Sequence, residues 1–481
     1  MDACDDDADA SQATYSEPEA ASLTQSHGEA SEGGTETAEV RQSPASRASS
    51  PLSSAPERAP RPSADAHEVV AAGDMGGEDN APAVGRAPSL ASRLLGGDAA
   101  VAHSGFPAHA GYVVVARSVA ELRAVVQEAT SALLPRRVSA LRVDAYGRSL
   151  GDAGAAAMAR QLSKLGGCGD LSSLDLDLAR NRIGDVGIEV LADALVNVTQ
   201  ISNLAIRLNG NLVGKSGAAS LAAPLRGRGA TLQTLVLHLR EGTLPGLGLA
   251  GLAAGLGELV GLRSLDLALR TDLHGFRCLC EGLGALGCLR SLRADVGGSL
   301  GGAQVAEPLA EALGSLATNA LLTTLSLDLW RVGLGDPGVD ILASAIAMGG
   351  ASVRTLDLRL GACDIGAAGV HTLAKAIAVL QGLTSLRLVL GGNCIGAAGA
   401  KSVAKACGKL RCLTLLGLDI SGNAVGDEGA CALARALETL GRRRAAPTEL
   451  ELNAGMNDIG ERGVRCMAQA LAQLRPLRSL E

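Results

Sequence analysis

The sequence predicts an α/β solenoid, a curved stack of short units with parallel strands on the inside and helices outside. The first observation is a period of about 31 residues that runs through residues 138–481. The second is that each period opens with alternating leucines and continues with an Ala/Leu-rich segment at helical spacing. The third is composition: apolar residues make up 47% of the chain but aromatic residues only 1%, which suits thin aliphatic layers.

The period is visible when two segments are aligned. LSSLDLDLARNRIGDVGIEVLADAL begins at Leu171, and LTSLRLVLGGNCIGAAGAKSVAKAC begins at Leu383. Both fit L-x-x-L-x-L-x-L-x-x-N-x-I-G-x-x-G. Aligned units begin at Val138, Leu171, Ile201, Leu232, Leu262, Leu289, Leu322, Val353, Leu383, Leu413, Pro447 and Leu477. The sequence therefore contains eleven full repeats and the start of a twelfth.

The opening of each repeat predicts a short strand. Leu174, Leu176 and Leu178 alternate along the chain, so they share one face of the strand. Asp175 and Asp177 then share the opposite face. Strands that follow one another through helices must run parallel, with right-handed crossovers.

The second half of each repeat predicts a helix. Gly184-Asp185 suits a turn and a helix N-cap, and Leu191 and Leu195 follow at helical spacing. Because helices are wider than strands, stacked units bend into a horseshoe with the strands on its concave side. A single unit offers too few aliphatic side chains to offset its ordering entropy, so the units must fold together.

These residues carry a family resemblance. I-G-x-x-G followed by LAxAL resembles the ribonuclease-inhibitor-like class of leucine-rich repeats, which also forms the repeat domains of NOD-like receptors and of the Ran GTPase-activating protein. The resemblance covers residues 138–481 and implies a leucine-rich-repeat solenoid that binds proteins. This sequence has about two extra residues between the strand and the Asn, so binding positions do not transfer from the family.

The flanks differ from the array. Residues 1–105 are rich in Ser, Ala, Pro and acids without an apolar period, which predicts a disordered tail. Residues 106–137 are expected to form an N-terminal capping region with a helix over 118–134. The chain stops at LRPLRSLE without a capping helix, so we expect a longer natural chain or a partner that covers this edge.

Charge and cysteines indicate a reduced, intracellular protein. A net charge of −7 gives no reason to expect nucleic acid, and the eleven cysteines are scattered without paired CxxC spacing. The acidic start MDACDDDADA lacks a secretory pattern. We expect a cytoplasmic location. The run Arg442 to Arg444 is a candidate for a weak nuclear localisation signal.

Three segments resemble functional motifs, but the repeat explains each of them. GLGLAG (246–251) fits a dinucleotide loop, GNLVGKS (210–216) is one residue short of a phosphate loop, and 242–257 is uncharged. All three fall in the register of the repeat, and the last is too short for a membrane span. The sequence predicts no membrane segment, no cofactor, no metal site and no catalytic set, and therefore a protein that is not an enzyme.

An Asn recurs at one template position. Because an amide both donates and accepts, stacked copies can satisfy the backbone of adjoining turns. The Asn positions are Asn181, Asn211, Asn393, Asn423 and Asn457, and the replacements elsewhere are Arg148, Gly242, Asp272, Val332 and Cys363. We expect the turns with replacements to be less well tied.

The outward strand positions predict the binding wall. Two rows of eleven positions hold nine acids and five Arg, which favours a protein partner with a basic or mixed surface. The alternative is that these are ordinary solvated positions. The predicted protein-binding residues are Asp175, Asp177, Arg207, Asp266, Arg293, Asp295, Asp328, Trp330, Asp357, Arg359, Arg387, Asp419 and Glu451. Trp330, the only Trp, is either a contact anchor or a shield for the repeat edge.

Two functions follow. The first is a protein-interaction scaffold or sensor that binds its partner on the concave face. The alternative is a GTPase activator for a Ran-like small GTPase, which the repeat class implies and which would use loop arginines to stabilise transition-state charge. Those arginines are Arg180, Arg182, Arg240, Arg270 and Arg331. A complete NOD-like receptor does not fit, because residues 1–137 cannot hold its nucleotide-binding domain.

Overall fold

The structure is a computed structural model of the chain. It describes residues 112–130, 138–167, 171–240, 242, 244–299, 301–318, 320–442, 446–474 and 477–480. The predicted tail, residues 1–105, lies outside these ranges. The chain divides into two units, Met1–Pro82 and Ala83–Glu481, and all described residues belong to the second.

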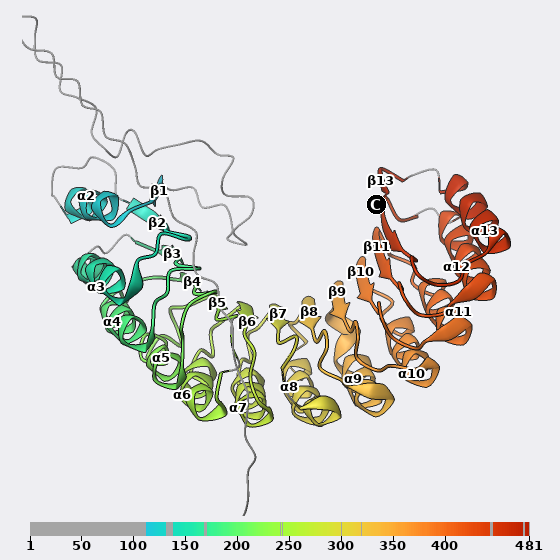
Figure 1. The fold of residues 1–481 in the computed structure, drawn as a ribbon, viewed down its shortest axis with the longest axis horizontal. Coiled ribbons are helices and arrows are strands. Elements are labelled where there is room, and N and C mark those ends of the chain that lie inside the picture. Colours follow the sequence, from blue (N-terminus) through green and yellow to red (C-terminus); the bar gives the residue numbers. More distant parts are fainter. Residues whose placement is uncertain are drawn as a thin grey trace, which may run out of the picture. The chain divides into compact units, whose positions relative to one another are not determined.

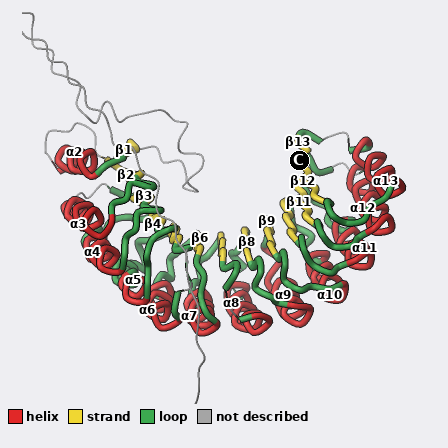
Figure 2. The backbone as a smooth tube through the Cα atoms, in the orientation of Figure 1, coloured by secondary structure: helices red, strands yellow, loops and turns green. Residues whose placement is uncertain are grey.

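The described residues form one leucine-rich-repeat solenoid, as predicted. Its thirteen strands lie in chain order in a single parallel sheet. Within this unit the strands line the inner side of a horseshoe and the helices lie on its outer side (Figures 1 and 2). The strands are β1 (Tyr112–Ala116), β2 (Val138–Asp144), β3 (Ser173–Asp177), β4 (Asn203–Arg207), β5 (Thr234–His238), β6 (Ser264–Ala268), β7 (Ser291–Asp295), β8 (Thr324–Asp328), β9 (Thr355–Arg359), β10 (Ser385–Val389), β11 (Leu415–Asp419), β12 (Glu449–Asn453) and β13 (Ser479–Leu480).

Each strand from β1 to β12 is followed by a helix. The α-helices are α2 (Val119–Thr130), α3 (Gly151–Leu162), α4 (Asp185–Val196), α5 (Lys215–Ser220), α6 (Gly246–Gly257), α7 (Leu273–Gly284), α8 (Ala306–Ala317), α9 (Gly335–Gly349), α10 (Ala367–Ala378), α11 (Gly396–Cys407), α12 (Gly426–Gly441) and α13 (Glu461–Ala472). Short 3-10 turns lie at η1 (Ser163–Gly167), η2 (Gly302–Val305) and η3 (Gly350–Ser352).

The core lies between sheet and helices and is continuous along the array. The strand leucines predicted to share one face, Leu174 and Leu176, are almost completely buried, as is Leu178 just after the strand. They pack with the apolar side of α4, through Leu191 and Leu195, in the same cluster that runs from β1 to the last helix. The predicted leucine alternation and the helical spacing are both confirmed.

The first strand was not predicted. The run YVVVA forms β1, which pairs in parallel with β2 and extends the sheet by one position before the first aligned repeat. Its consecutive β-branched residues favour a strand, but it lacks the leucine template that marks the later repeats. The helix expected over 118–134 is α2, which is described as far as Thr130.

A ladder of buried Asn side chains joins neighbouring turns, as expected. Asn393 Nδ2 donates to the carbonyls of Leu360 (2.9 Å) and Leu390 (2.7 Å). Its Oδ1 accepts from the amides of Cys363 (2.9 Å) and Ile365 (3.1 Å) in the preceding repeat. Asn181, Asn211, Asn423 and Asn457 are likewise buried and bonded to backbone groups.

The expectation that turns without Asn are poorly tied is wrong at two places. The Cys363 thiol takes the place of the amide and lies 3.0 Å from the carbonyl oxygen of Leu329. In another turn the hydroxyl of buried Thr271 donates to the carbonyl of Leu244 at 3.0 Å. The Cys363 thiol reaches the carbonyl that Asn bonds in other turns, whereas Thr271 connects its turn to the preceding repeat through a different carbonyl.

A second ladder runs along the helix N-termini and corrects the predicted cap at Asp185. Gly184 is the N-cap of α4, and the capping carboxylate comes from the preceding repeat: Asp152 accepts from the amides of Gly184 (2.7 Å) and Gly187 (3.2 Å). Asp185 in turn accepts from Gly214 (2.6 Å) of the next repeat. Asp336 bonds Gly366, and Asp427 bonds Gly460 and Gly463, in the same way. A negative charge at a helix N-terminus is favourable, so this ladder also couples neighbours.

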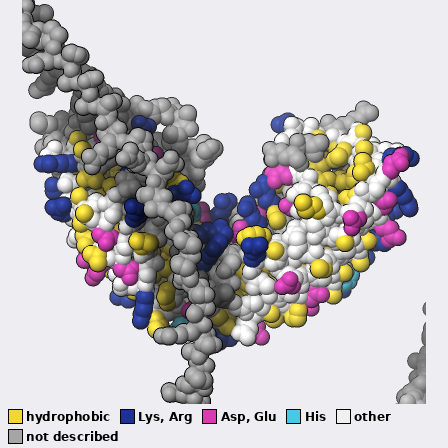
Figure 3. Space-filling view, in the orientation of Figure 1, with side chains coloured by type: hydrophobic (Ala, Val, Ile, Leu, Met, Phe, Trp, Pro, Cys, Tyr) yellow, Lys and Arg dark blue, Asp and Glu magenta, His cyan; other side chains and the backbone are white. Residues whose placement is uncertain are grey.

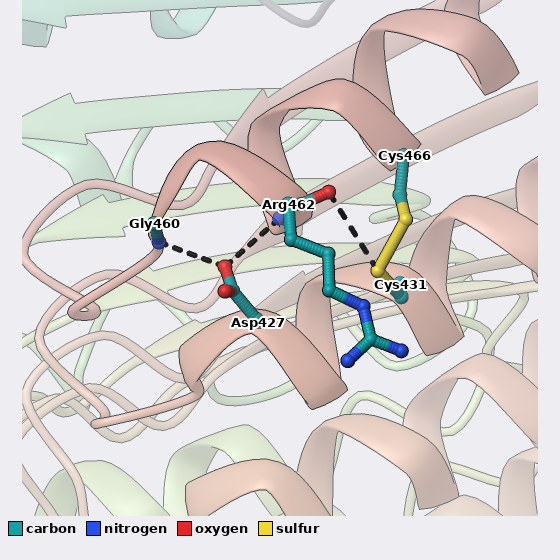
Figure 4. The surroundings of a disulfide bond; sticks show 6 residues. Asp427, Cys431, Gly460, Arg462 and Cys466 are labelled. Carbon is teal, nitrogen blue, oxygen red and sulfur yellow. Dashed lines mark hydrogen bonds between the residues drawn. A yellow bond between two sulfur atoms is a disulfide. The ribbon is translucent and has the colours of Figure 1, made fainter.

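The expectation of uniformly reduced cysteines is wrong. Cys431 of α12 and Cys466 of α13 form a disulfide, with their Cα atoms 5.3 Å apart (Figure 4). The two residues are 35 apart in sequence, which in a stacked array places them on adjacent helices. The cysteines therefore give no argument for a reducing compartment.

Three of the seven free cysteines in the described residues, Cys280, Cys363 and Cys407, are buried in the core, whereas Cys278 is half-buried and Cys288, Cys394 and Cys412 are exposed. Cys280 and Cys407 are buried, and burial raises the pKa of the Cys407 thiol to about 12. Burial also raises the pKa of Cys280. These two thiols are protonated and unreactive at neutral pH.

The Asn ladder makes a direct prediction. Asn393→Ala should lower the free energy of unfolding by roughly 2–4 kcal/mol, because it leaves buried backbone groups in two repeats without partners. Urea denaturation of the full chain measures this. Asn453→Ala, at an exposed position of β12, is the control and should change stability by less than about 0.5 kcal/mol. Equal effects of the two substitutions would contradict the ladder.

The disulfide makes a second prediction. Digestion without reductant should yield a linked Cys431–Cys466 peptide by mass spectrometry. Replacing both by Ala should cost roughly 2–4 kcal/mol, because the bond closes a loop of 35 residues in the unfolded chain. Cys278→Ala/Cys288→Ala is the control, since both residues are free thiols. Finding Cys431 and Cys466 alkylated in the native protein would contradict the assignment.

Candidate functional site: the concave wall

Two rows of side chains cross the concave face of the sheet, in the register that the repeat alignment predicts. The middle row pairs Arg142, Asp175, Ala205, Val236, Asp266, Arg293, Ser326, Asp357, Arg387, Gly417 and Glu451 in order. The end row pairs Asp144, Asp177, Arg207, His238, Ala268, Asp295, Asp328, Arg359, Val389, Asp419 and Asn453. We call these 22 positions the concave wall.

In the first repeats, an acid is enclosed by two arginines. Asp175 is only 5% exposed and forms ion pairs with Arg207 and, at 3.8 Å, with Arg142. Burial raises the pKa of Asp175 despite the lowering effect of both guanidinium groups. Asp177 instead accepts a hydrogen bond from the amide of Ala179 at 3.2 Å. Asp175 therefore holds the wall together more than it faces a partner.

In the central repeats, acids are also paired within the chain. Arg240 reaches across one repeat to Asp295. Arg359 lies between Asp328 (3.9 Å) and Asp357 (3.5 Å). Burial raises the pKa of Asp295, with the charge of Asp328 adding to the effect and Arg240 opposing it. Asp295, Asp328 and Asp357 are therefore each paired with an arginine of the same chain.

In the last repeats the wall is hollowed. Gly417 has no side chain, and Arg387 and Glu451 form an ion pair across it. The hollow is about 270 Å³ in volume, and Asp419, Arg359 and Asn453 are among its lining residues. Asp419 accepts from the amide (3.0 Å) and hydroxyl (2.7 Å) of Ser421.

Pairs that skip a repeat were not predicted. Arg240–Asp295 passes over Ala268, and Arg387–Glu451 passes over Gly417. For Arg387–Glu451 the signal was present in the middle row, where Gly417 between opposite charges leaves room for the arginine to cross, whereas Arg240 lies outside both rows. Six of the nine acids of the concave wall lie in ion pairs or beside His238, and the other three, Asp144, Asp177 and Asp419, have no ion pair in the described residues, so the wall presents charges of both signs with acids in excess.

Trp330 lies in the loop that follows β8, at the end of the wall. Its amide donates to Asp328 at 3.1 Å, and its side chain is 39% exposed. The guanidinium of Arg331 lies 4.5 Å from the centre of its ring. A Cβ on Gly361 of the next repeat would lie 2.8 Å from Trp330 Cδ1, so the ring also covers that glycine. The structure thus gives Trp330 features of both predicted roles.

The motif-like segments serve the repeat. Residues 246–251 are the first half of α6, and the Gly246 amide donates to Asp272 at 3.1 Å. In the phosphate-loop-like segment the Gly214 amide donates to Asp185. Both amides that would face a phosphate already bind a carboxylate.

Metal and membrane features were searched across the described ranges. No group of three or more His, Cys, Asp or Glu side chains there is placed to hold a metal ion. None of the helices in those ranges is both long and apolar enough to span a bilayer.

No protein-family model matches the sequence, and no curated protein matches it. Among solved structures, the chain is similar to an internalin from Listeria monocytogenes (17% identity, 76% of this chain and 94% of that chain, TM-score 0.38). It is also similar to a chain of the yeast Rad7 and Elc1 complex (15% identity, 76% of each chain, TM-score 0.41). A third is the Leptospira interrogans leucine-rich-repeat protein LIC12759 (17% identity, 66% and 79%, TM-score 0.32).

The buried acid Asp175 makes a signed prediction. Because its pKa is raised above 3.8, the folded chain keeps this proton to a higher pH than the unfolded chain. The protonated carboxyl of Asp175 stabilises the fold fully at a pH below its pKa in the unfolded chain. This stabilisation is lost as the pH rises through its higher pKa in the folded chain. The free energy of unfolding of Asp175→Asn, measured by urea denaturation, should therefore rise relative to that of the wild type as the pH is raised from about 3 to about 7. The opposite trend would show that the two arginines outweigh burial.

Proposed function

We propose that the protein is an interaction scaffold of the ribonuclease-inhibitor-like repeat class that binds a protein partner on its concave wall. The observation that carries the proposal is the wall itself: two continuous rows of mainly polar and charged side chains on the inner face of the sheet. The helices lie on the outer side of the sheet (Figure 2), so the side chains that point away from them line the inner side of the repeat unit. A curved face of this size can enclose a convex partner surface.

The wall is also pre-organised. Four of its five arginines are held by carboxylates of neighbouring repeats, as in Arg207–Asp175 and Arg387–Glu451, and Arg293 is the exception in the described residues. A side chain that is already ordered loses less conformational entropy when a partner binds. Because charges of both signs alternate along the wall, the partner that fits it carries a mixed surface.

The GTPase-activating alternative has less support. An activator arginine must be able to enter the site of a bound GTPase. Arg240 is paired with Asp295, and the guanidinium of Arg180 lies 5.8 Å from the ring centre of Tyr146. Arg270 donates to the carbonyl of Gly297, and it shares with Arg182 and Arg331 the lack of an ion pair in the described residues, so the alternative depends on these three arginines. A GTP-hydrolysis assay with a Ran-like GTPase tests this alternative, and unchanged hydrolysis is the expected result.

The concave-wall proposal predicts a selective loss of binding. Asp266→Lys/Asp357→Lys should reduce recovery of the partners captured by the full chain from native lysate by at least about tenfold. These two acids lie in the middle row and are more accessible than Asp175. Glu281→Lys/Glu307→Lys, on the outer helices α7 and α8, makes the same charge change and should leave recovery unchanged. Loss of the same partners in both variants, or in neither, would contradict the proposal.

A further inference from the structure

The central repeats carry three arginines without an ion pair in the described residues, and one of them stacks on the single tryptophan. Arg293 lies in the middle row on β7, Arg270 follows β6, and Trp330 and Arg331 follow β8. We call these four residues the arginine–tryptophan patch. Lys and Arg side chains are seen to gather inside the concavity of the repeat unit over its central strands (Figure 3).

Two consecutive glycines create the floor of the patch. Gly298 has a φ of +73°, a conformation that favours glycine, and its amide donates to the carbonyl of Trp330 at 2.7 Å. A Cβ there would lie 3.3 Å from Arg270 Nε, and Arg270 Nε donates to the Gly297 carbonyl at 3.2 Å. The bare backbone thus lets the Arg270 guanidinium lie against the loop that follows β7, which is itself bonded to the backbone of Trp330.

The cations of the patch lack carboxylate partners. Across the described residues no ion pair joins Arg270, Arg293 or Arg331 to an acid, although most arginines of the concave wall have one. Arg293 and Arg331 are exposed, and Arg331 is stacked on the Trp330 ring. A guanidinium held by stacking keeps its N–H groups free to donate in the ring plane.

The nearby acids are already engaged. Asp295 is paired with Arg240, and Asp357 lies beside Arg359. Asp328 accepts the Trp330 amide and lies 3.9 Å from Arg359. Asp266, which pairs in register with Arg293, is 3.2 Å from His238. Arg240 and Arg359 thus take up Asp295, Asp328 and Asp357, and the guanidinium groups of Arg270, Arg293 and Arg331 remain without an ion pair in the described residues.

We propose that this patch binds an acidic segment of the partner protein, with Asp or Glu carboxylates on Arg270, Arg293 and Arg331 and an apolar side chain against Trp330. The inference rests on the proposed function, because it states where on the concave wall the acidic part of the partner's mixed surface binds. Carboxylates accept bidentate hydrogen bonds from guanidinium groups, and an aromatic residue beside arginines is the usual make-up of an interface anchor.

The test uses Trp330 as its own reporter, because it is the only tryptophan in the chain. The probe is a synthetic twelve-residue peptide of alternating Glu and Leu, titrated into the full-length protein while Trp emission is followed. Matched peptides carry Lys or Gln in place of Glu. The Glu peptide should change the emission saturably and bind more weakly as salt is raised, and the Lys and Gln peptides should not bind.

Charge reversal locates the site. Arg293→Glu/Arg331→Glu should weaken binding of the Glu peptide by about tenfold or more. Arg293→Glu alone is compared with Arg290→Glu, which makes the same single charge reversal at an exposed position of the same repeat at the opposite edge of the sheet and should change binding by less than about twofold. Unchanged circular dichroism melts show that the variants fold.

Three outcomes would overturn the inference: no emission change with the Glu peptide, equal weakening by Arg290→Glu, or tighter binding of a single-stranded oligonucleotide of equal charge. The proposed function has a separate readout in partner recovery with Asp266→Lys/Asp357→Lys. If those variants lose partners while the Glu peptide fails to bind, the wall is the binding face and the acidic-segment assignment alone is wrong.

Discussion

Every repeat in this protein depends on the next one to complete it. Strand leucines such as Leu174 are buried only because neighbouring layers close over them. The same dependence extends to polar groups: the amides of one turn bond the Asn of the next, and the N-terminus of one helix bonds an Asp of the repeat before it. The array is thus cooperative in both its apolar and its polar contacts, and this rigidity fixes the spacing of the concave wall.

The sequence predicted those features that recur with the period. Leucine alternation identified the strands, and one alignment placed both wall rows in their observed register. Features specific to a single pair of repeats were harder to predict. The capping role of Asp185 was assigned to its own helix because local rules do not consider a neighbour 29 residues away. The Cys431–Cys466 bond required knowing which helix faces lie side by side, and β1 lacks the template altogether.

The wall illustrates the difference between composition and arrangement. Counting its acids favoured a partner with a basic or mixed surface, but the count does not show which acids are held in ion pairs within the wall. Small residues at Ala268 and Gly417 allow arginines to cross a repeat, so charge that is distant in sequence is neutralised in space. The informative feature of the wall is therefore the set of central arginines near Trp330 that have no ion pair in the described residues. The sign of the total charge is less informative.

Hydrogen exchange of the full chain tests the mutual completion of repeats most directly. The amides of Cys363 and Ile365 lie in a loop, and their acceptor is Asn393 of the following repeat. The account predicts that they exchange as slowly as the strand amides of β9 and β10, because they open only when two repeats separate. Exchange at the rate of a solvated loop, with the strands still protected, would contradict it.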